Sequence, residues 1–340
     1  MPLDESVEEL RKESDVHGEQ AVLCFLEGRF DQALGYADRA VQAHDELCRA
    51  LGGGPSLLLA THVYATRLIH RAEIRRALCR TLPDPRLRER ECRPALEDCR
   101  LAVEAFRRGA AAARGELPLW IPAAQLLAAE FHAWAGEPYT ALDQSVQAIA
   151  HYRTRGIAGP EGGAVLAHAL ARCADLLWVA GARQESLDAR CEAVETYRAH
   201  TAVGGLLWDR RHNQGVTWST TPTYEDFCRT AQLLAGCAGE PRAGAAPAVL
   251  PALQDAVEGW AELVPLHDYP HHQPSTAMSE LTASALTMQR WLGALGEQEL
   301  AQRYYQAFRS CVPRTPHDQR WAVPVRELRA DVEAAAARFG

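Results

Sequence analysis

The sequence predicts an all-α protein made of stacked helical hairpins, and three observations lead to this fold class. First, a glycine followed by mostly small residues five and twelve positions later recurs four times. Closely packed helices need small side chains where they cross and a glycine where the chain reverses. Second, 340 residues suit about seven hairpins of roughly 34 to 45 residues each. Third, no segment has the alternation or β-branched density of a strand. The four copies are Gly28/Ala33/Ala40, Gly136/Ala141/Ala148, Gly181/Ser186/Ala193 and Gly296/Ala301/Phe308.

The first two hairpins are predicted over 5–51 and 56–114. The segment 5–51 turns at Gly28 and ends at a run of three glycines followed by a proline, which cannot continue a helix. The segment 56–114 is a degenerate repeat, because a loop carrying Pro83 and Pro85 replaces the tight glycine turn.

The next two hairpins follow the repeated phrase most closely. They are predicted over 119–155, with its turn at Gly136, and over 164–200, with its turn at Gly181. In both, an alanine-rich helix precedes the glycine and a helix with small residues at regular spacing follows it. We expect these two neighbours to stack most regularly.

The C-terminal part is less regular. An irregular insertion is predicted over 201–222, followed by a degenerate repeat over 223–264, a repeat over 275–313 and an amphipathic helix over 322–340. The last helix would cap the open end of the stack, since a repeat array needs a polar outer face at its end.

The composition is that of a folded, acidic protein. Hydrophobic residues make up 47% and charged residues 24% of the chain, which differs from the composition of disordered segments. The formal net charge is -8. Because binding to a nucleic-acid backbone requires a basic face, we expect no nucleic-acid partner. Lys12 is the one lysine and alanine is abundant, a bias typical of GC-rich bacterial genes.

The predicted location is the cytoplasm, without a membrane partner. The first residues lack the basic and then apolar pattern of a signal peptide. No stretch approaches the ~18 uncharged apolar residues of a membrane-spanning helix. The ten cysteines contain no Cys-x-x-Cys pair, which excludes zinc-ribbon spacing. We expect them to be reduced thiols that fill small apolar positions on helix faces.

At these residues the chain resembles the tetratricopeptide repeat family. Ala21, Gly28, Ala33 and Ala40 match the family's small and glycine positions, and so do Ala129, Gly136, Ala141 and Ala148, and Ala174, Gly181, Ser186 and Ala193. The last unit departs from the pattern with Gln289 and Phe308. The resemblance implies a right-handed superhelix of about seven hairpins, whose concave face is built from the first helix of each hairpin and holds a peptide or partner protein.

Carried onto this sequence, the resemblance implies a peptide-binding groove with acidic and aromatic side chains. Such a groove would suit a basic or partly apolar segment. The Lys, Arg and Asn set with which chaperone-binding members hold a C-terminal carboxylate is missing. The predicted groove residues are Glu130, Trp134, His168, Asp175, Trp178 and Arg290.

Two irregular loops are further candidate sites. The insertion 201–222 combines aromatic and basic groups, which can stack bases and pair phosphates, but in an acidic protein a lid that contacts the ligand is favoured. The loop after it could bind zinc or iron, although Pro270 prevents helical ligand spacing and a plain surface loop is favoured. The residues are Trp208, Arg210, Arg211, His212 and Trp218 in the insertion, and His267, Asp268, His271 and His272 in the loop.

Three functions remain open at the level of sequence. The first is an interaction protein that binds a peptide or protein partner in its groove. The second is a peptide- or ligand-responsive regulator that lacks its own DNA-binding domain. The third is an atypical biosynthetic enzyme, metal-dependent if the histidine-rich loop binds metal. No nucleotide-binding or hydrolase signature is present, so the sequence indicates no catalysis and no cofactor, and it leaves the oligomeric state open.

Overall fold

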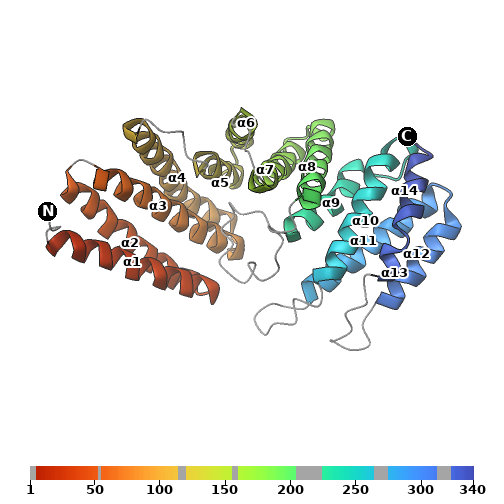
Figure 1. Ribbon diagram of the computed structural model, residues 1–340, viewed down its shortest axis with the longest axis horizontal. Coiled ribbons are helices and arrows are strands. Elements are labelled where there is room, and N and C mark those ends of the chain that lie inside the picture. Colours follow the sequence, from red (N-terminus) through yellow and green to blue (C-terminus); the bar gives the residue numbers. More distant parts are fainter. Residues whose placement is uncertain are drawn as a thin grey trace. The chain divides into compact units, whose positions relative to one another are not determined.

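The computed structural model describes residues 5–52, 55–113, 120–154, 160–203, 224–263, 275–311 and 323–340, and within them it is all-helical without a strand (Figure 1). The prediction of an all-α fold is confirmed. Contacts divide the chain into two compact units. Unit 1 contains 1–158 and 210–221, and unit 2 contains 159–209 and 222–340.

Unit 1 consists of three consecutive helix pairs. In each pair the two helices pack side by side. The second helix of one pair also packs against the first helix of the next, and α3 additionally touches α5. The unit is therefore layered, with contacts made mainly between neighbours in sequence. The bounds are α1 Glu5–Leu26, α2 Phe30–Leu51, α3 Pro55–Thr81, α4 Pro85–Ala113, α5 Trp120–Trp134 and α6 Pro138–Thr154.

Unit 2 also consists of helix pairs, followed by two short helices. The bounds are α7 Pro160–Val179, α8 Arg183–Val203, α9 Tyr224–Ala238, α10 Ala246–Leu263, α11 Ser275–Ala294, α12 Gln298–Cys311, α13 Val323–Arg326 and α14 Arg329–Ala337, with a 3₁₀ turn over Ala243–Ala245.

The glycines of the repeated phrase lie where the chain turns between paired helices. Gly28, Gly136, Gly181 and Gly296 have φ values of 72°, 79°, 84° and 86°. At each of them the next residue donates its backbone N–H to the carbonyl five residues earlier, at 2.8 to 2.9 Å. This is the Schellman ending, whose left-handed residue favours glycine because a side chain there is strained. The predicted turns are confirmed, and the backbone angle is their physical reason.

The small residues of the phrase are buried where helices meet. Ala33, Ala141, Ala148 and Ala193 are completely or almost completely inaccessible, and Ser186 is buried with its hydroxyl donating to the Ala174 carbonyl at 2.7 Å. The serine satisfies its own hydrogen bond within the hairpin, so it replaces an alanine without leaving an unpaired polar group.

Unit 2 is organised around α10, which is buried over most of its surface. It packs against α9, α11, α13 and α14. Its Trp260 is fully buried and donates its indole N–H to Gln232 Oε1 at 3.1 Å. Gly259 permits the close crossing with α9, since a side chain there would collide with the Cys228 sulfur. The predominantly apolar surface of α10 is thus covered by its neighbours, and its buried polar residues Gln254, Asp255 and Glu258 form hydrogen bonds or ion pairs with side chains of other elements or of α10 itself.

The predicted C-terminal helix 322–340 is wrong as a single element. The structure has two short helices, α13 and α14, separated by a turn at Glu327 and Leu328. The turn lets Val325 and Leu328 be buried, and the Val325 carbonyl accepts a hydrogen bond from Gln254 of α10 at 2.9 Å. Both short helices contact α10.

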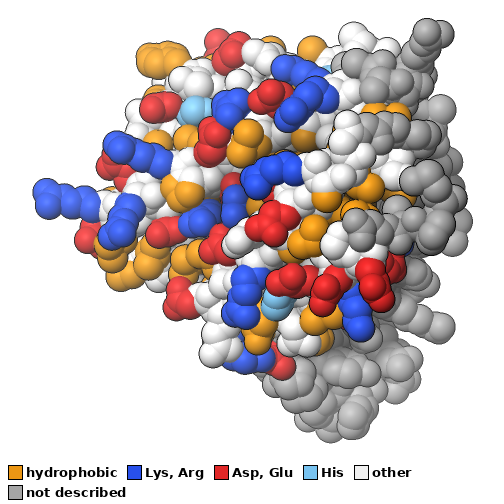
Figure 2. Space-filling view, turned by 90° about the vertical axis from the view of Figure 1, so that its left-hand side faces the viewer, with side chains coloured by type: hydrophobic (Ala, Val, Ile, Leu, Met, Phe, Trp, Pro, Cys, Tyr) orange, Lys and Arg blue, Asp and Glu red, His pale blue; other side chains and the backbone are white. Residues whose placement is uncertain are grey.

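One face of the molecule, which includes the N-terminal side of Figure 1, is shown in Figure 2. Acidic and basic side chains alternate over its described residues, and hydrophobic side chains form only small areas between them. This mixture is typical of a solvated helical surface. None of the described helices is long and apolar enough to cross a membrane.

Candidate binding groove on α4, α5 and α6

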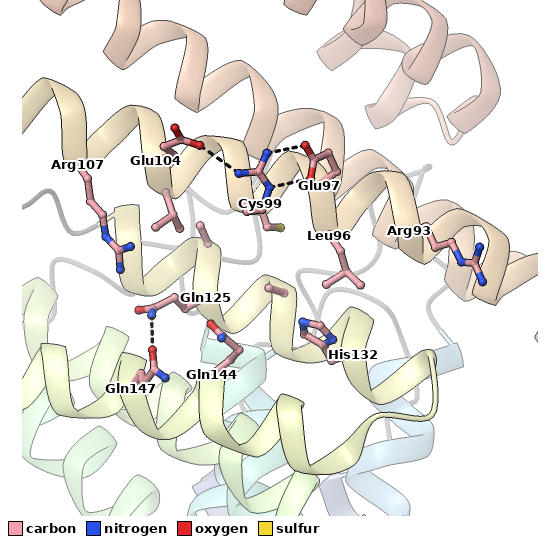
Figure 3. Close-up of a pocket in the computed structure, with 14 residues that line it drawn as sticks. Arg93, Leu96, Glu97, Cys99, Glu104, Arg107, Gln125, His132, Gln144 and Gln147 are labelled. Atoms are coloured by element: carbon pink, nitrogen blue, oxygen red, sulfur yellow. Dashed lines mark hydrogen bonds and ion pairs between the residues drawn. The ribbon is translucent and has the colours of Figure 1, made fainter.

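An open groove of about 680 Å³ lies within unit 1, between α4, α5 and α6 (Figure 3). The α5 helix forms its floor, and α4 and α6 form its walls. The second helices of two hairpins thus contribute the walls, whereas the sequence predicted a groove on the first helices. Its residues are Arg93, Leu96, Glu97, Cys99, Arg100, Val103, Glu104 and Arg107 of α4, Ala124, Gln125, Ala128 and His132 of α5, and Gln144 and Gln147 of α6.

The groove arises from the helical spacing of its residues. On α4 the lining positions recur every three or four residues and so share one face. On α5 the floor includes Ala124 and Ala128, whose small side chains leave room between the walls. Gln125 and His132 stand beside them on a helix whose other residues, apart from Glu130 on the opposite face, are apolar. This polar pair at helical spacing is the signal that could have revealed the groove from sequence.

The centre of the α4 wall is electrically balanced. Arg100 binds both oxygens of Glu97, at 2.8 and 2.7 Å, and also donates to Glu104 at 3.1 Å. The hydrogen bond from Arg100 lowers the pKa of Glu97. Glu104 lies 3.9 Å from Arg108 as well. The carboxylates of this wall therefore have partners on their own helix.

Each end of the same wall carries an exposed arginine, Arg93 or Arg107. Among the described residues, no carboxylate forms an ion pair with Arg93 or Arg107, and both side chains are exposed. Arg107 extends from α4 at the end where Gln125 and Gln147 lie, and Arg93 lies at the end of His132 (Figure 3). At each end the groove thus has a guanidinium that forms no ion pair within the described part of the chain.

Side-chain amides form the opposite side. Gln125 is only 8% exposed and donates to Gln147 Oε1 at 3.1 Å. Gln147 in turn donates to Asp143 at 2.8 Å. Each of these amides keeps one N–H, and Gln125 keeps its carbonyl oxygen, for further hydrogen bonds. Gln144 offers a complete amide beside them. His132 is held by Glu137, with Nδ1 2.7 Å from a carboxylate oxygen.

Glu130 and Trp134, which the sequence assigned to the groove, lie on the other face of α5. They are about half a helical turn away from the floor residues. Glu130 lies 3.0 Å from Arg80 and 3.5 Å from Arg76 of α3, and Trp134 packs on Phe131 with ring centroids 5.6 Å apart. Because α3 already neutralises Glu130, this carboxylate does not support the predicted preference for a basic ligand.

The remaining predicted groove residues belong to unit 2. Asp175 is exposed but bonded at 2.5 Å to Arg190, and the Arg183 guanidinium lies 3.5 Å from the centre of the Trp178 ring. Asp175 is thus also compensated within the chain. His168 is buried on α7, with Nδ1 4.0 Å from Asp226 of α9. Arg290 is exposed on α11.

The two predicted loop sites cannot be placed. Trp208, Arg210, Arg211, His212 and Trp218 of the insertion, and His267, Asp268, His271 and His272 of the histidine-rich loop, lie outside the described residues. Within the part of the chain that the structure does describe, no group of three or more His, Cys, Asp or Glu side chains could hold a metal ion.

Comparisons with known proteins assign this chain to no family. No family model matches the sequence, and no curated protein matches it. One solved structure, described as "Computational Design of Self-Assembling Cyclic Protein Homooligomers", covers 98% of this chain and 98% of its own length at 12% identity, with a TM-score of 0.20. With a TM-score this low, the match indicates nothing about the fold or the function of this chain.

Proposed function

We propose that this chain is an interaction protein that binds a peptide segment of a partner in the groove between α4, α5 and α6. The observation that carries the proposal is the groove: an open space with a small-residue floor, hydrogen-bonding amides on one side and, at both ends, guanidinium groups that form no ion pair among the described residues. Ligand sites combine such a concave surface with a few polar groups that orient the ligand.

The face formed by the first helices is less suited to binding a peptide. Glu130 and Asp175 have arginine partners within the chain, and Trp178 is covered by a guanidinium. A ligand there would have to displace these contacts before making its own. In the groove on α4, α5 and α6, a ligand at Arg93 and Arg107 would displace no ion pair formed within the described helices.

We further propose that the hairpins continue the tetratricopeptide-like arrangement as one right-handed superhelix in the cytoplasm. The shared Schellman turns and the buried small positions support this arrangement; the cytoplasmic location follows from the sequence prediction. Small-angle X-ray scattering would test the superhelix. A radius of gyration near ~20 Å, as expected for a compact domain of this length, would contradict it.

Selection of peptides tests the binding proposal. The purified chain is used to select from a library of displayed random peptides, and enriched peptides are measured by fluorescence anisotropy on the wild type and on Ala128→Phe, which fills the groove floor. Ala150→Phe is the matched control, because Ala150 is exposed on α6 and does not line the groove.

We expect Ala128→Phe to weaken binding by about tenfold or more, since a benzyl group occupies space that the ligand would use. Ala150→Phe should leave the affinity unchanged. Equal binding to both variants would remove the groove as the site, and a selection without enriched peptides would contradict the proposed function. Circular dichroism and thermal melting check that both variants fold.

A further inference from the structure

The charges of the groove indicate what kind of peptide it takes. Glu97 and Glu104 are engaged by Arg100, and Glu104 also by Arg108. The two remaining charged groups of the α4 wall, Arg93 and Arg107, are positive and have no ion-pair partner among the described residues. A ligand with negative charge at matching positions would gain attraction at both ends without breaking an existing ion pair.

The spacing of the two arginines sets the length of the ligand. Arg93 and Arg107 are fourteen positions apart on one continuous helix. With a rise of about 1.5 Å per residue, their backbone positions are roughly 21 Å apart. An extended peptide advances about 3.3 Å per residue, so it spans this distance in about six residues.

The amides on the other side fit the backbone of such a peptide. A side-chain amide presents one carbonyl acceptor and two N–H donors, which complement the C=O and N–H groups of an extended chain. Gln125 is held in place by its bond to Gln147, and Gln147 by its bond to Asp143. Less side-chain freedom is therefore lost when these groups bind a ligand.

A peptide fits better than a nucleic-acid strand, which also carries regularly spaced negative charge. The described lining residues include no Phe, Tyr or Trp on which a base could stack, whereas Leu96, Val103 and Ala128 offer aliphatic surface. At the centre of the wall Arg100 is already engaged by Glu97 and Glu104, so a strand with a phosphate at every nucleotide would find no available positive charge between the two end arginines.

We propose that the groove binds an extended acidic peptide segment, with one carboxylate at Arg93 and a second, about six residues away, at Arg107. This rests on the proposed function and adds the chemical class of the ligand. The residues between the two acidic positions would be small or aliphatic, to fit between the glutamines and the floor at Ala128.

Defined peptide pools test the proposal by fluorescence anisotropy. One pool of labelled, end-capped peptides has glutamate at two positions separated by about six residues, and random Ala, Ser, Thr, Asn and Leu between them. A second pool has glutamine at both positions. A third has two glutamates separated by half that distance, so only one of them can reach an arginine. A labelled single-stranded oligonucleotide serves as a separate probe.

At low salt we expect the widely spaced glutamate pool to bind about tenfold more tightly than the glutamine pool, because each exposed charge pair contributes about twofold to fivefold. The closely spaced pool should lose about threefold relative to the widely spaced one. Added salt should reduce the preference for glutamate, since it screens exposed charges.

Arginine variants localise the effect. Arg93→Gln and Arg107→Gln should each reduce the preference for glutamate by about threefold, and the double variant should abolish it. Arg86→Gln is the matched control, because Arg86 is exposed on the same helix but does not line the groove. All of these positions are exposed, so the variants should fold, which a thermal melt verifies.

The outcomes separate this inference from the proposed function. If selected peptides bind through the groove but the glutamate and glutamine pools bind equally, the acidic ligand is wrong and the peptide-binding function remains. If no pool binds, the acidic ligand is overturned, and the library selection decides the function. Tighter binding of the oligonucleotide, lost in the Arg93 and Arg107 variants, would replace the peptide with a nucleic acid.

Discussion

Unit 1 and unit 2 are built from the same helical hairpin but differ in how their helices share contacts. In unit 1 each helix packs mainly on its neighbours in sequence, and α3 also forms ion pairs with α1, α2, α4 and α5 through its arginines. In unit 2 one helix, α10, is surrounded by α9, α11, α13 and α14. A layered unit leaves accessible surface between its layers, and the groove between α4, α5 and α6 is an example. A unit with a central helix buries the corresponding surface.

The buried charges show the same contrast. The arginines of α3 bind carboxylates of four other helices, among them Asp98 of α4, which is 2% exposed. In unit 2 the acidic residues lie on α10 itself, where Asp255 and Glu258 bind arginines of the C-terminal helices and of α8. Charge pairs thus connect successive layers in unit 1 and attach the surrounding helices to the central one in unit 2. The α3 pairs are Arg67 with Asp15, Arg71 with Asp38 and Asp98, Arg75 with Glu91, and Arg76 and Arg80 with Glu130.

Removal of the central tryptophan should have the largest effect. Trp260→Ala leaves a cavity in α10 and removes the hydrogen bond to Gln232, so we expect a loss of about 4 kcal/mol in the free energy of unfolding. Hydrogen exchange should show lost protection throughout α9 to α14. The matched variant Phe131→Ala, fully buried in unit 1, should expose α4 to α6 and leave α1 and α2 protected. Equally local effects in both units would refute the contrast.

Acid should destabilise unit 1 through a half-buried histidine on α3. Burial, and then the positive charge of Arg67, lower the pKa of His70 from its ordinary value of 6.5 to about 4. Between these values the unfolded chain binds a proton that the folded chain does not, so stability falls as the pH decreases through this range. The loss from this group is at most about 3 kcal/mol.

Burial lowers the pKa of His44 in the same direction. Denaturant unfolding measured across this pH range, followed by hydrogen exchange in α1 to α3, checks the expectation. His70→Gln should flatten the pH dependence of unit 1. An unchanged slope in that variant would show that other groups cause it.

Substitution of one glycine in each unit tests how tightly the helices cross there. In Gly259→Ala the new methyl group meets the buried Cys228 sulfur, so we expect a loss of about 2 kcal/mol from overpacking. In Gly18→Ala the obstacle is the end of the flexible Arg67 side chain, which can move away. The gain of up to about 1 kcal/mol in helix propensity then roughly offsets the lost contact with Asp15.

Thermal unfolding of both variants measures this difference. The double variant Gly259→Ala with Cys228→Ala should regain part of the loss, because the shorter side chain makes room for the methyl group. A double-mutant cycle without coupling would show that the crossing is not as tight as the structure indicates.

The smallest expected effect concerns the attachment of the C-terminal helices. Arg329→Gln removes the pairs with Asp255 and Glu258, but Arg198 and Arg326 still contact these carboxylates. We expect a loss of about 1 kcal/mol. The control Arg303→Gln removes an ion pair whose two side chains are about half exposed and should change stability by less than about 0.5 kcal/mol. Denaturant titration distinguishes the two, and equal losses would contradict a special role for α10.

The helix pairs were predictable from sequence because their signals are local. A glycine at the left-handed position of a Schellman turn is required by the backbone angle, whichever residues surround it. Gly28 and Gly136 could therefore be identified without a structure. The small residues Ala33 and Ala148 were predictable for the same reason. In each hairpin the crossing of the two helices lies at a fixed distance from the glycine turn.

The groove was not predicted because its parts are distant in sequence and individually ordinary. Arg93 and Arg107 belong to a charged helix face that resembles any solvated surface. Gln125 and His132 are polar residues on a mostly apolar helix, and Gln144 lies on a third element. They become a site only when α4 and α6 pack on either side of α5.

The sequence alone thus determined the helical class, the pairing of helices and the turns, because periodicity and glycine act over a few residues. Only the tertiary structure decided which carboxylates are neutralised and which surface remains open. The sequence predicts Glu130 as an acidic groove residue, whereas in the fold it forms an ion pair with Arg80 of α3. Ion pairs between helices depend on contacts between residues far apart in the chain, such as Arg80 and Glu130, and no local pattern specifies them.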